Sequence, residues 1–141
     1  MNWPDPGVLP HGPAFRLVQS VEAIAGDRIT CACRIPDLFP LVAGAKMPTY
    51  LALEGLAQSA GLLAAHLACQ DAKTAGRAVK STPGYVARIR QATFIRSEMD
   101  GTLPWSADAQ LEGRSGHMIL CRGEVLQGTT LILQAGLALY I

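Results

Sequence analysis

A long apolar segment, from Pro48 to Ala72, constrains the fold of this chain more than any other feature. The segment is rich in Ala and Leu, which favour helix, and it is too long for a single strand. The proline at its start suits the first turn of a helix. Because Leu and Ala occur on all sides of the predicted helix, we expect protein to surround it rather than water to cover one side.

A membrane-spanning role for this segment has to be weighed, because residues 51–69 nearly suffice to cross a bilayer at about 1.5 Å per residue. Glu54, Gln58 and His66 argue against it. An ionisable residue near the bilayer centre costs about 2.5 kcal/mol or more, and no flanking Lys/Arg cluster marks an inner end. We therefore expect a buried core helix and no membrane insertion.

Composition indicates one domain, residues 1–141, with an interface to another subunit. Half of the residues are hydrophobic and only 16% are charged, a balance that is hard to bury within one small monomer. The 12 Lys+Arg and 11 Asp+Glu give a net charge of +1, with the basic residues scattered, so we expect no nucleic acid partner. Residues 1–10 lack the features of a secretory signal, which favours a cytoplasmic location.

The four cysteines do not form a recognisable zinc or disulfide pattern. Cys31 and Cys33 alternate along a predicted strand, while Cys69 and Cys121 stand alone, and there is no CxxC pair. We interpret all four as small buried residues of a reducing compartment.

The rest of the chain reads mainly as strands. Residues 16–24 and 27–35 contain β-branched residues in partial alternation and are separated by Gly26-Asp27, which predicts a hairpin. Residues 36–47 form an irregular connection before the helix, and a polar stretch, 70–82, follows it. The later predicted strands are 84–95, 105–113, 117–127 and 129–140, which we expect to form an antiparallel meander. This order predicts an α+β fold in which a curved sheet wraps around one central helix.

Glu54 is the most conspicuous candidate for chemistry. A carboxylate in the second turn of a buried helix is costly unless it is paired or protonated, and burial is expected to raise its pKa. A neutral carboxylic acid can protonate a departing hydroxyl group. The alternative is a structural ion pair with an arginine of the sheet, such as Arg88 or Arg90. Gln58 lies on the same helical face and either orients the Glu54 carboxyl or satisfies a nearby backbone group.

His11 is the second candidate, within a Pro- and Gly-containing stretch at residues 9–13. Such loops often carry functional side chains, and a His pKa near 6.5 suits proton removal at neutral pH. An inert histidine near the terminus is the alternative. His66 and His117 are interpreted as structural.

The start of the helix, at residues 47–50, is itself a candidate binding site. Its first backbone N–H groups have no partner within the helix and lie at the positive end of the dipole. They can bind a carbonyl oxygen that gains negative charge. Because every helix has such a terminus, this feature alone is weak evidence.

Together these residues resemble the bacterial fatty-acid 3-hydroxyacyl-[acyl carrier protein] dehydratases. The N-terminal match is Leu9-Pro10-His11, with the aromatic Phe15 four residues later. The later matches are Phe39-Pro40, Met47-Pro48, Leu53-Glu54 and Ala57-Gln58, with the six-residue step from Pro48 to Glu54 retained. The resemblance covers residues 9–64 by motif and the later strands by pattern only, and it implies a hotdog fold.

The resemblance also implies a mechanism and a set of partners. Two subunits form a dimer with a tunnel for the acyl chain, in which His11 is the base and Glu54 the acid. Gln58 steadies Glu54, and the amides near Thr49 and Tyr50 hold the developing enolate oxygen. The implied substrate-binding residues are Thr49, Tyr50, Gln58, Phe15 and Met47. The acyl group arrives on the phosphopantetheine arm of an acyl carrier protein, and no metal or organic cofactor is required.

Two departures from the family pattern leave alternatives open. Residues 41–46, LVAGAK, replace a typically shorter connection that includes a His, and Thr49 replaces the usual Gly, whose lack of a Cβ eases approach to the amides. These changes resemble the divergent dehydratase-like proteins of aryl-polyene and related polyketide clusters, some of which pair with a second hotdog subunit. The dimer can thus be a homodimer or a heterodimer. The alternatives to a dehydratase are a non-catalytic partner subunit and an acyl-thioester hydrolase, and His11 argues against the hydrolase.

Overall fold

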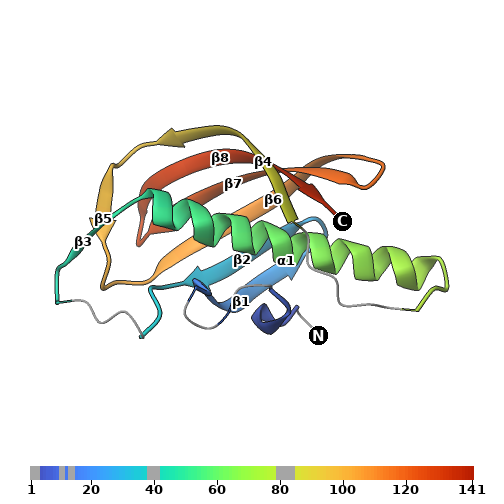
Figure 1. Ribbon diagram of the computed structural model, residues 1–141, viewed down its shortest axis with the longest axis horizontal. Coiled ribbons are helices and arrows are strands. Elements are labelled where there is room, and N and C mark those ends of the chain that lie inside the picture. Colours follow the sequence, from blue (N-terminus) through green and yellow to red (C-terminus); the bar gives the residue numbers. More distant parts are fainter. Residues whose placement is uncertain (1–3, 10–11, 13–14, 38–41, 79–84) are drawn as a thin grey trace.

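One long helix crosses one face of a large antiparallel sheet in the computed structural model, which describes residues 4–9, 12, 15–37, 42–78 and 85–141 (Figure 1). The elements are η1 (Pro6–Val8), β1 (Val18–Ala25), β2 (Arg28–Cys33), β3 (Lys46–Pro48), α1 (Tyr50–Thr74), β4 (Tyr85–Phe94), β5 (Glu98–Asp100), β6 (Trp105–Ser115), β7 (Met118–Gln127) and β8 (Thr130–Tyr140). Six strands form the main sheet in the order β1-β2-β6-β7-β8-β4, and β3 pairs with β5 separately. The expected α+β architecture is confirmed.

The sheet differs from a simple meander at one strand. The β1–β2 hairpin turns at Gly26, whose φ of 59° lies in the left-handed region that glycine adopts without strain. Strands β6, β7 and β8 follow one another as expected. However, β4 pairs with β8 at the far edge, and β6 pairs instead with β2. The prediction that 84–95 begins a continuous meander was therefore wrong, because spatial neighbours in a sheet need not be sequence neighbours.

Helix α1 begins two residues later than predicted and is buried along only part of its length. Pro48 is the last residue of β3, where it pairs with Glu98, so the helix starts at Tyr50. Its buried residues lie between Ala52 and Ala65, and the last turns are half-buried or exposed. Figure 1 shows the reason, since the helix runs beyond the sheet. The expectation that protein surrounds the whole helix was wrong for its final third.

The same helix is long and apolar enough to cross a membrane by length and composition. However, 61% of its apolar window is buried inside the protein. The buried side chains include Leu56, Leu62 and Leu63, which pack against the sheet as part of one hydrophobic core. This packing identifies α1 as a core helix.

The cysteines behave as small apolar residues. Cys31, Cys33 and Cys121 are buried free thiols, and Cys69 is half-buried. Burial raises the pKa of Cys31 to about 11 and that of Cys121 to about 12, because an apolar environment disfavours the thiolate. The expectation of small buried residues is confirmed for these two and for Cys33, but Cys69 is only half-buried.

Close packing between α1 and β7 depends on Gly123. A Cβ at this position would lie 2.8 Å from the backbone oxygen of Asp108 and 2.5 Å from a methyl group of Leu56. We expect Gly123→Ala to lower the free energy of unfolding by about 1 to 3 kcal/mol through overpacking. Gly113→Ala is the matched control, because a Cβ there meets no atom within 4 Å. Urea denaturation measures both, and equal stability of the two variants would show that the sheet adjusts freely at Gly123.

Candidate active site

The amide side chain of Gln58 joins the second and third turns of α1 to the start of β1. Its Oε1 accepts hydrogen bonds from the backbone N–H groups of Leu17, at 2.8 Å, and Val18, at 3.3 Å. Its Nε2 donates to the backbone oxygen of Phe15, at 2.8 Å, and to Oε1 of Glu54, at 3.2 Å. Gln58 is 1% exposed, so this amide is fully used inside the protein.

Both interpretations of Gln58 are therefore correct. The side chain satisfies three backbone groups at the beginning of β1 and also contacts the Glu54 carboxylate. Phe15 follows His11 by four residues, and the chain thus enters β1 beside Glu54. His11 itself lies outside the described residues.

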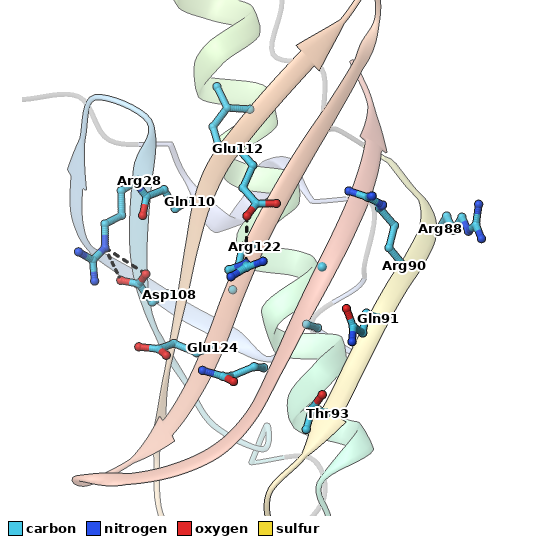
Figure 2. Close-up of a pocket in the computed structure, with 15 residues that line it drawn as sticks. Arg28, Arg88, Arg90, Gln91, Thr93, Asp108, Gln110, Glu112, Arg122 and Glu124 are labelled. Carbon is cyan, nitrogen blue, oxygen red and sulfur yellow. Dashed lines mark hydrogen bonds and ion pairs between the residues drawn. The ribbon is translucent and has the colours of Figure 1, made fainter.

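Glu54 is exposed in the single chain rather than buried as expected. It belongs to the helical face that the sheet leaves uncovered, whereas its neighbour Gly55 packs against Trp105 of β6. The alternative ion pair with Arg88 or Arg90 was wrong, because these arginines line the opposite face of the sheet from α1 (Figure 2). Glu54 is thus held by Gln58 at a surface, where a substrate or another subunit can reach it.

The start of α1 is fixed by Thr49. Its backbone N–H donates to the oxygen of Ser97, at 3.2 Å, and its hydroxyl donates to the oxygen of Arg96, at 2.7 Å. Thr49 is therefore not an open donor, which corrects the expectation that its own amide contributes to the site. Among the described residues, the N–H groups of Tyr50 and Leu51 have no acceptor, so the open N–H groups lie one residue further along the chain than expected.

Strands β3 and β5 support this helix terminus. Met47 and Met99 lie opposite each other in the pair and are 5% and 3% exposed. Gln127 of β7 donates from Nε2 to the backbone oxygen of Asp100, at 2.8 Å, which ties β5 to the main sheet. The buried side chain of Met47 thus packs in the β3–β5 pair that supports the start of α1. Residues 96–97 and Gln127 were missed from the sequence, because their hydrogen bonds to Thr49 and Asp100 join segments that are far apart in the chain.

The remaining candidates occupy separate positions. Phe15 and Tyr50 are 67% and 63% exposed, respectively, so both side chains are open to contact. His66 lies about three turns after Glu54 along α1, where burial, followed by the charge of Lys73, lowers its pKa. His117 is exposed in the turn between β6 and β7. Neither described histidine is placed to act with Glu54.

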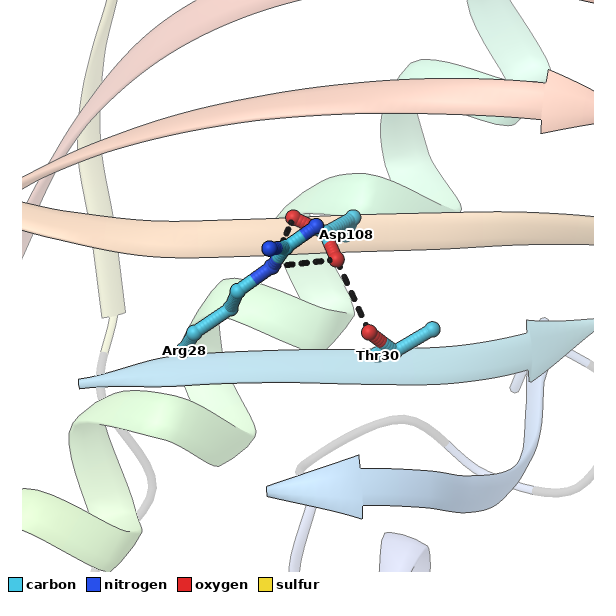
Figure 3. A network of polar contacts seen from close by, with 3 residues as sticks. All are labelled: Arg28, Thr30 and Asp108. Atoms are coloured by element: carbon cyan, nitrogen blue, oxygen red, sulfur yellow. Dashed lines mark hydrogen bonds and ion pairs between the residues drawn. The ribbon is translucent and has the colours of Figure 1, made fainter. Parts of the chain in front are cut away.

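A broad concavity of about 940 Å³ lies on the outer face of the sheet, away from α1 (Figure 2). Within it, Nε of Arg28 donates to both carboxylate oxygens of Asp108, at 3.0 and 2.9 Å, and the Thr30 hydroxyl donates to the same carboxylate at 2.8 Å (Figure 3). This pairing raises the pKa of Arg28. Because Glu54 lies on the other side of the sheet, the outer concavity is not part of the candidate active site.

Comparison with known proteins identifies the family. A model of the ApeP-like family, described as ApeP dehydratase, matches residues 4–141. The chain belongs to the ApeP-like dehydratase family. The resemblance to hotdog dehydratases, including the divergent aryl-polyene group, is therefore confirmed. A search of curated proteins found no match to this ApeP-like chain.

Solved structures agree on the fold. The dehydratase heterocomplex ApeI:P from Xenorhabdus doucetiae superposes with a TM-score of 0.72 at 17% identity, covering 94% of this chain and 87% of that one. A hypothetical thioesterase protein with coenzyme A from Streptococcus pneumoniae gives 0.63 at 6% identity, with 86% of each chain covered. The PaaI protein of the Escherichia coli phenylacetic acid degradation operon also gives 0.63 at 6%, covering 86% and 77%. The ApeP-like chain thus has the hotdog fold.

The Gln58 contacts predict a large stability cost for an apolar replacement. We expect Gln58→Leu to lower the free energy of unfolding by about 2 to 4 kcal/mol, because the buried N–H groups of Leu17 and Val18 lose their acceptor and the oxygen of Phe15 loses one hydrogen bond. Gln70→Leu on the same helix is the control, since Gln70 is exposed and its side chain contacts His66 at the surface. We expect less than about 0.5 kcal/mol for the control. Urea denaturation would contradict this interpretation if both variants were equally stable.

Proposed function

We propose that this ApeP-like protein dehydrates 3-hydroxyacyl thioesters carried on acyl carrier protein to trans-2-enoyl thioesters. The observation that carries the proposal is the Gln58 amide, which holds Glu54 beside the segment that follows His11. Open N–H groups at Tyr50 and Leu51 begin the same helix one turn earlier. Membership of a dehydratase family supports this reaction class.

In the proposed reaction, His11 removes a proton from C2 of the thioester. The N–H groups of Tyr50 and Leu51 stabilise the negative charge that develops on the thioester oxygen. Glu54 donates its carboxyl proton to the C3 hydroxyl, which leaves as water while the double bond forms between C2 and C3. His11 then releases the proton it gained and Glu54 regains one, so no other reactant is consumed.

We further propose that the protein is soluble, acts in the cytoplasm and pairs with another hotdog subunit through strand β4. Ile89 and Phe94 pair in register with Leu137 and Leu133, whose side chains are buried under α1, so they face the helix side. Yet they remain 46% and 43% exposed, because α1 covers little of β4. A partner subunit would bury this apolar surface. A tunnel shared by the two subunits would also bury Glu54.

A non-catalytic partner subunit is the second candidate function. The structure from Xenorhabdus doucetiae is a heterocomplex of two dehydratase proteins, which favours a role in which this chain completes the site of another hotdog protein. The different 41–46 connection and Thr49 are consistent with that role. The two candidates differ in whether His11 takes part in the reaction.

Substitution of the proposed acid and base tests the dehydratase. We expect His11→Ala and Glu54→Gln each to lower formation of the enoyl thioester by about a hundredfold or more, because each removes one proton transfer. His117→Ala is the control and is expected to leave turnover unchanged, since His117 is exposed in the turn between β6 and β7. The assay follows the enoyl product and free thiol with 3-hydroxyacyl thioesters of several chain lengths, with and without a second hotdog subunit.

The outcomes separate the alternatives. Where two copies of this chain pair, mixing the two inactive variants restores activity only if His11 and Glu54 of one site come from different subunits, as the family resemblance implies. Activity with a second subunit that survives His11→Ala would point to the partner role. Release of free thiol without enoyl product would point to a hydrolase. No enoyl product under any condition would rule out the dehydratase.

A further inference from the structure

Strand β4 is an edge strand with an unusual charge. Among the described strands it pairs only with β8, so its other side is open. Residues 85–97 contain Arg88, Arg90 and Arg96 but no Asp or Glu. All 11 acidic residues of the chain lie in the described ranges, and none forms an ion pair there with Arg88 or Arg90. The positive charge of this edge is therefore uncompensated.

The other arginines of the same outer face are neutralised. Arg28 pairs with Asp108, and Nε of Arg122 lies 3.0 Å from Oε1 of Glu112. These pairs lie on β2, β6 and β7, toward the opposite side of the concavity (Figure 2). The free cationic groups are thus confined to β4, where the neighbouring lining residues are Gln91, Thr93 and Gln134 and carry no charge.

The two arginines project in different directions from the edge. Arg88 is exposed and extends away from the sheet beyond β4, whereas Arg90 leans back toward β8 (Figure 2). The register shifts between Val86 and Arg88 and between Ile89 and Gln91, so the strand contains two irregularities. Charges and bulges on an edge strand both discourage pairing with an identical strand.

A second copy of this chain is therefore a poor partner for β4. In a two-fold antiparallel pairing centred on residues 88 to 90, the arginines at 88 and 90 of the two copies lie directly opposite each other or one position apart. Like charges at such positions are destabilising. Nevertheless, the apolar side chains of Ile89 and Phe94 stay exposed on the helix side, which favours an occupant of some kind.

We propose that Arg88 and Arg90 select the partner of β4: they disfavour a second copy of this chain and favour a hotdog subunit whose edge strand carries carboxylates. The inference rests on the proposed pairing through β4 and deepens it by stating the chemistry of the partner. Ile89 and Phe94 supply contact area common to any partner. The arginines determine which subunit binds, because charge at an interface discriminates between partners more than it adds affinity.

A charge-reversed variant of this chain can serve as the acidic partner in a binding test. The double variant Arg88→Glu/Arg90→Glu is mixed with the unaltered chain, and association is measured by sedimentation velocity and native mass spectrometry. We expect the mixed dimer to form at least about tenfold more tightly than either chain with itself, and added salt to reduce the difference. The control, Arg34→Glu/Arg77→Glu, changes net charge equally at exposed residues away from β4.

A second variant keeps the proposal testable if the first variant misfolds. Arg88→Gln/Arg90→Gln removes the repulsion without adding charge and is expected to self-associate more tightly than the unaltered chain. Circular dichroism checks that both variants fold. Self-association of the unaltered chain as tight as the mixture, an equal gain with the control, or no association in any combination would overturn the proposal. Because no substrate is used, these results are independent of the dehydratase assay.

Discussion

The buried amide of Gln58 is the contact on which the arrangement of this protein depends. Four hydrogen bonds from one side chain fix the first residues of β1 against α1 and hold the Glu54 carboxylate. A buried amide without partners costs more than a hydrogen bond contributes, so helix and strand can pack only in the relation that satisfies Gln58. That relation sets where the sheet begins, and it places the segment after His11 beside the candidate acid.

A second support holds the same part of the helix from its N-terminal end. The backbone and hydroxyl of Thr49 both bond to residues 96–97, and β5 is tied to β7 through Gln127. The first turns of α1 are thus fixed at two points, which suits groups that must meet a substrate in a defined geometry. The last turns are held in part by the surface pair of Arg114 and Asp71, and exposed ion pairs contribute little to stability.

The sequence predicted the features that repeat over many residues. The helix and six long strands were recognised because their composition and periodicity extend over at least one or two turns or several alternations. The short strands β3 and β5 and the position of β4 were missed, since the first are three residues long and the second depends on long-range pairing. Glu54 and Gln58 were identified as one helical face, but the exposure of Glu54 and the loss of the Thr49 amide required the tertiary structure.

The exposed edge strand β4 accounts for part of the high hydrophobic content, which a single small chain cannot fully bury. Half the residues are hydrophobic, and part of that surplus lies on the helix side of β4, at Ile89 and Phe94. Apolar surface alone would accept any matching edge, including its own copy, which is a route to aggregation. In our proposal, the uncompensated arginines on the same strand disfavour the identical copy at little cost in contact area. In the proposed pairing, the inner face of β4 supplies affinity and the charge of β4 supplies the choice of partner.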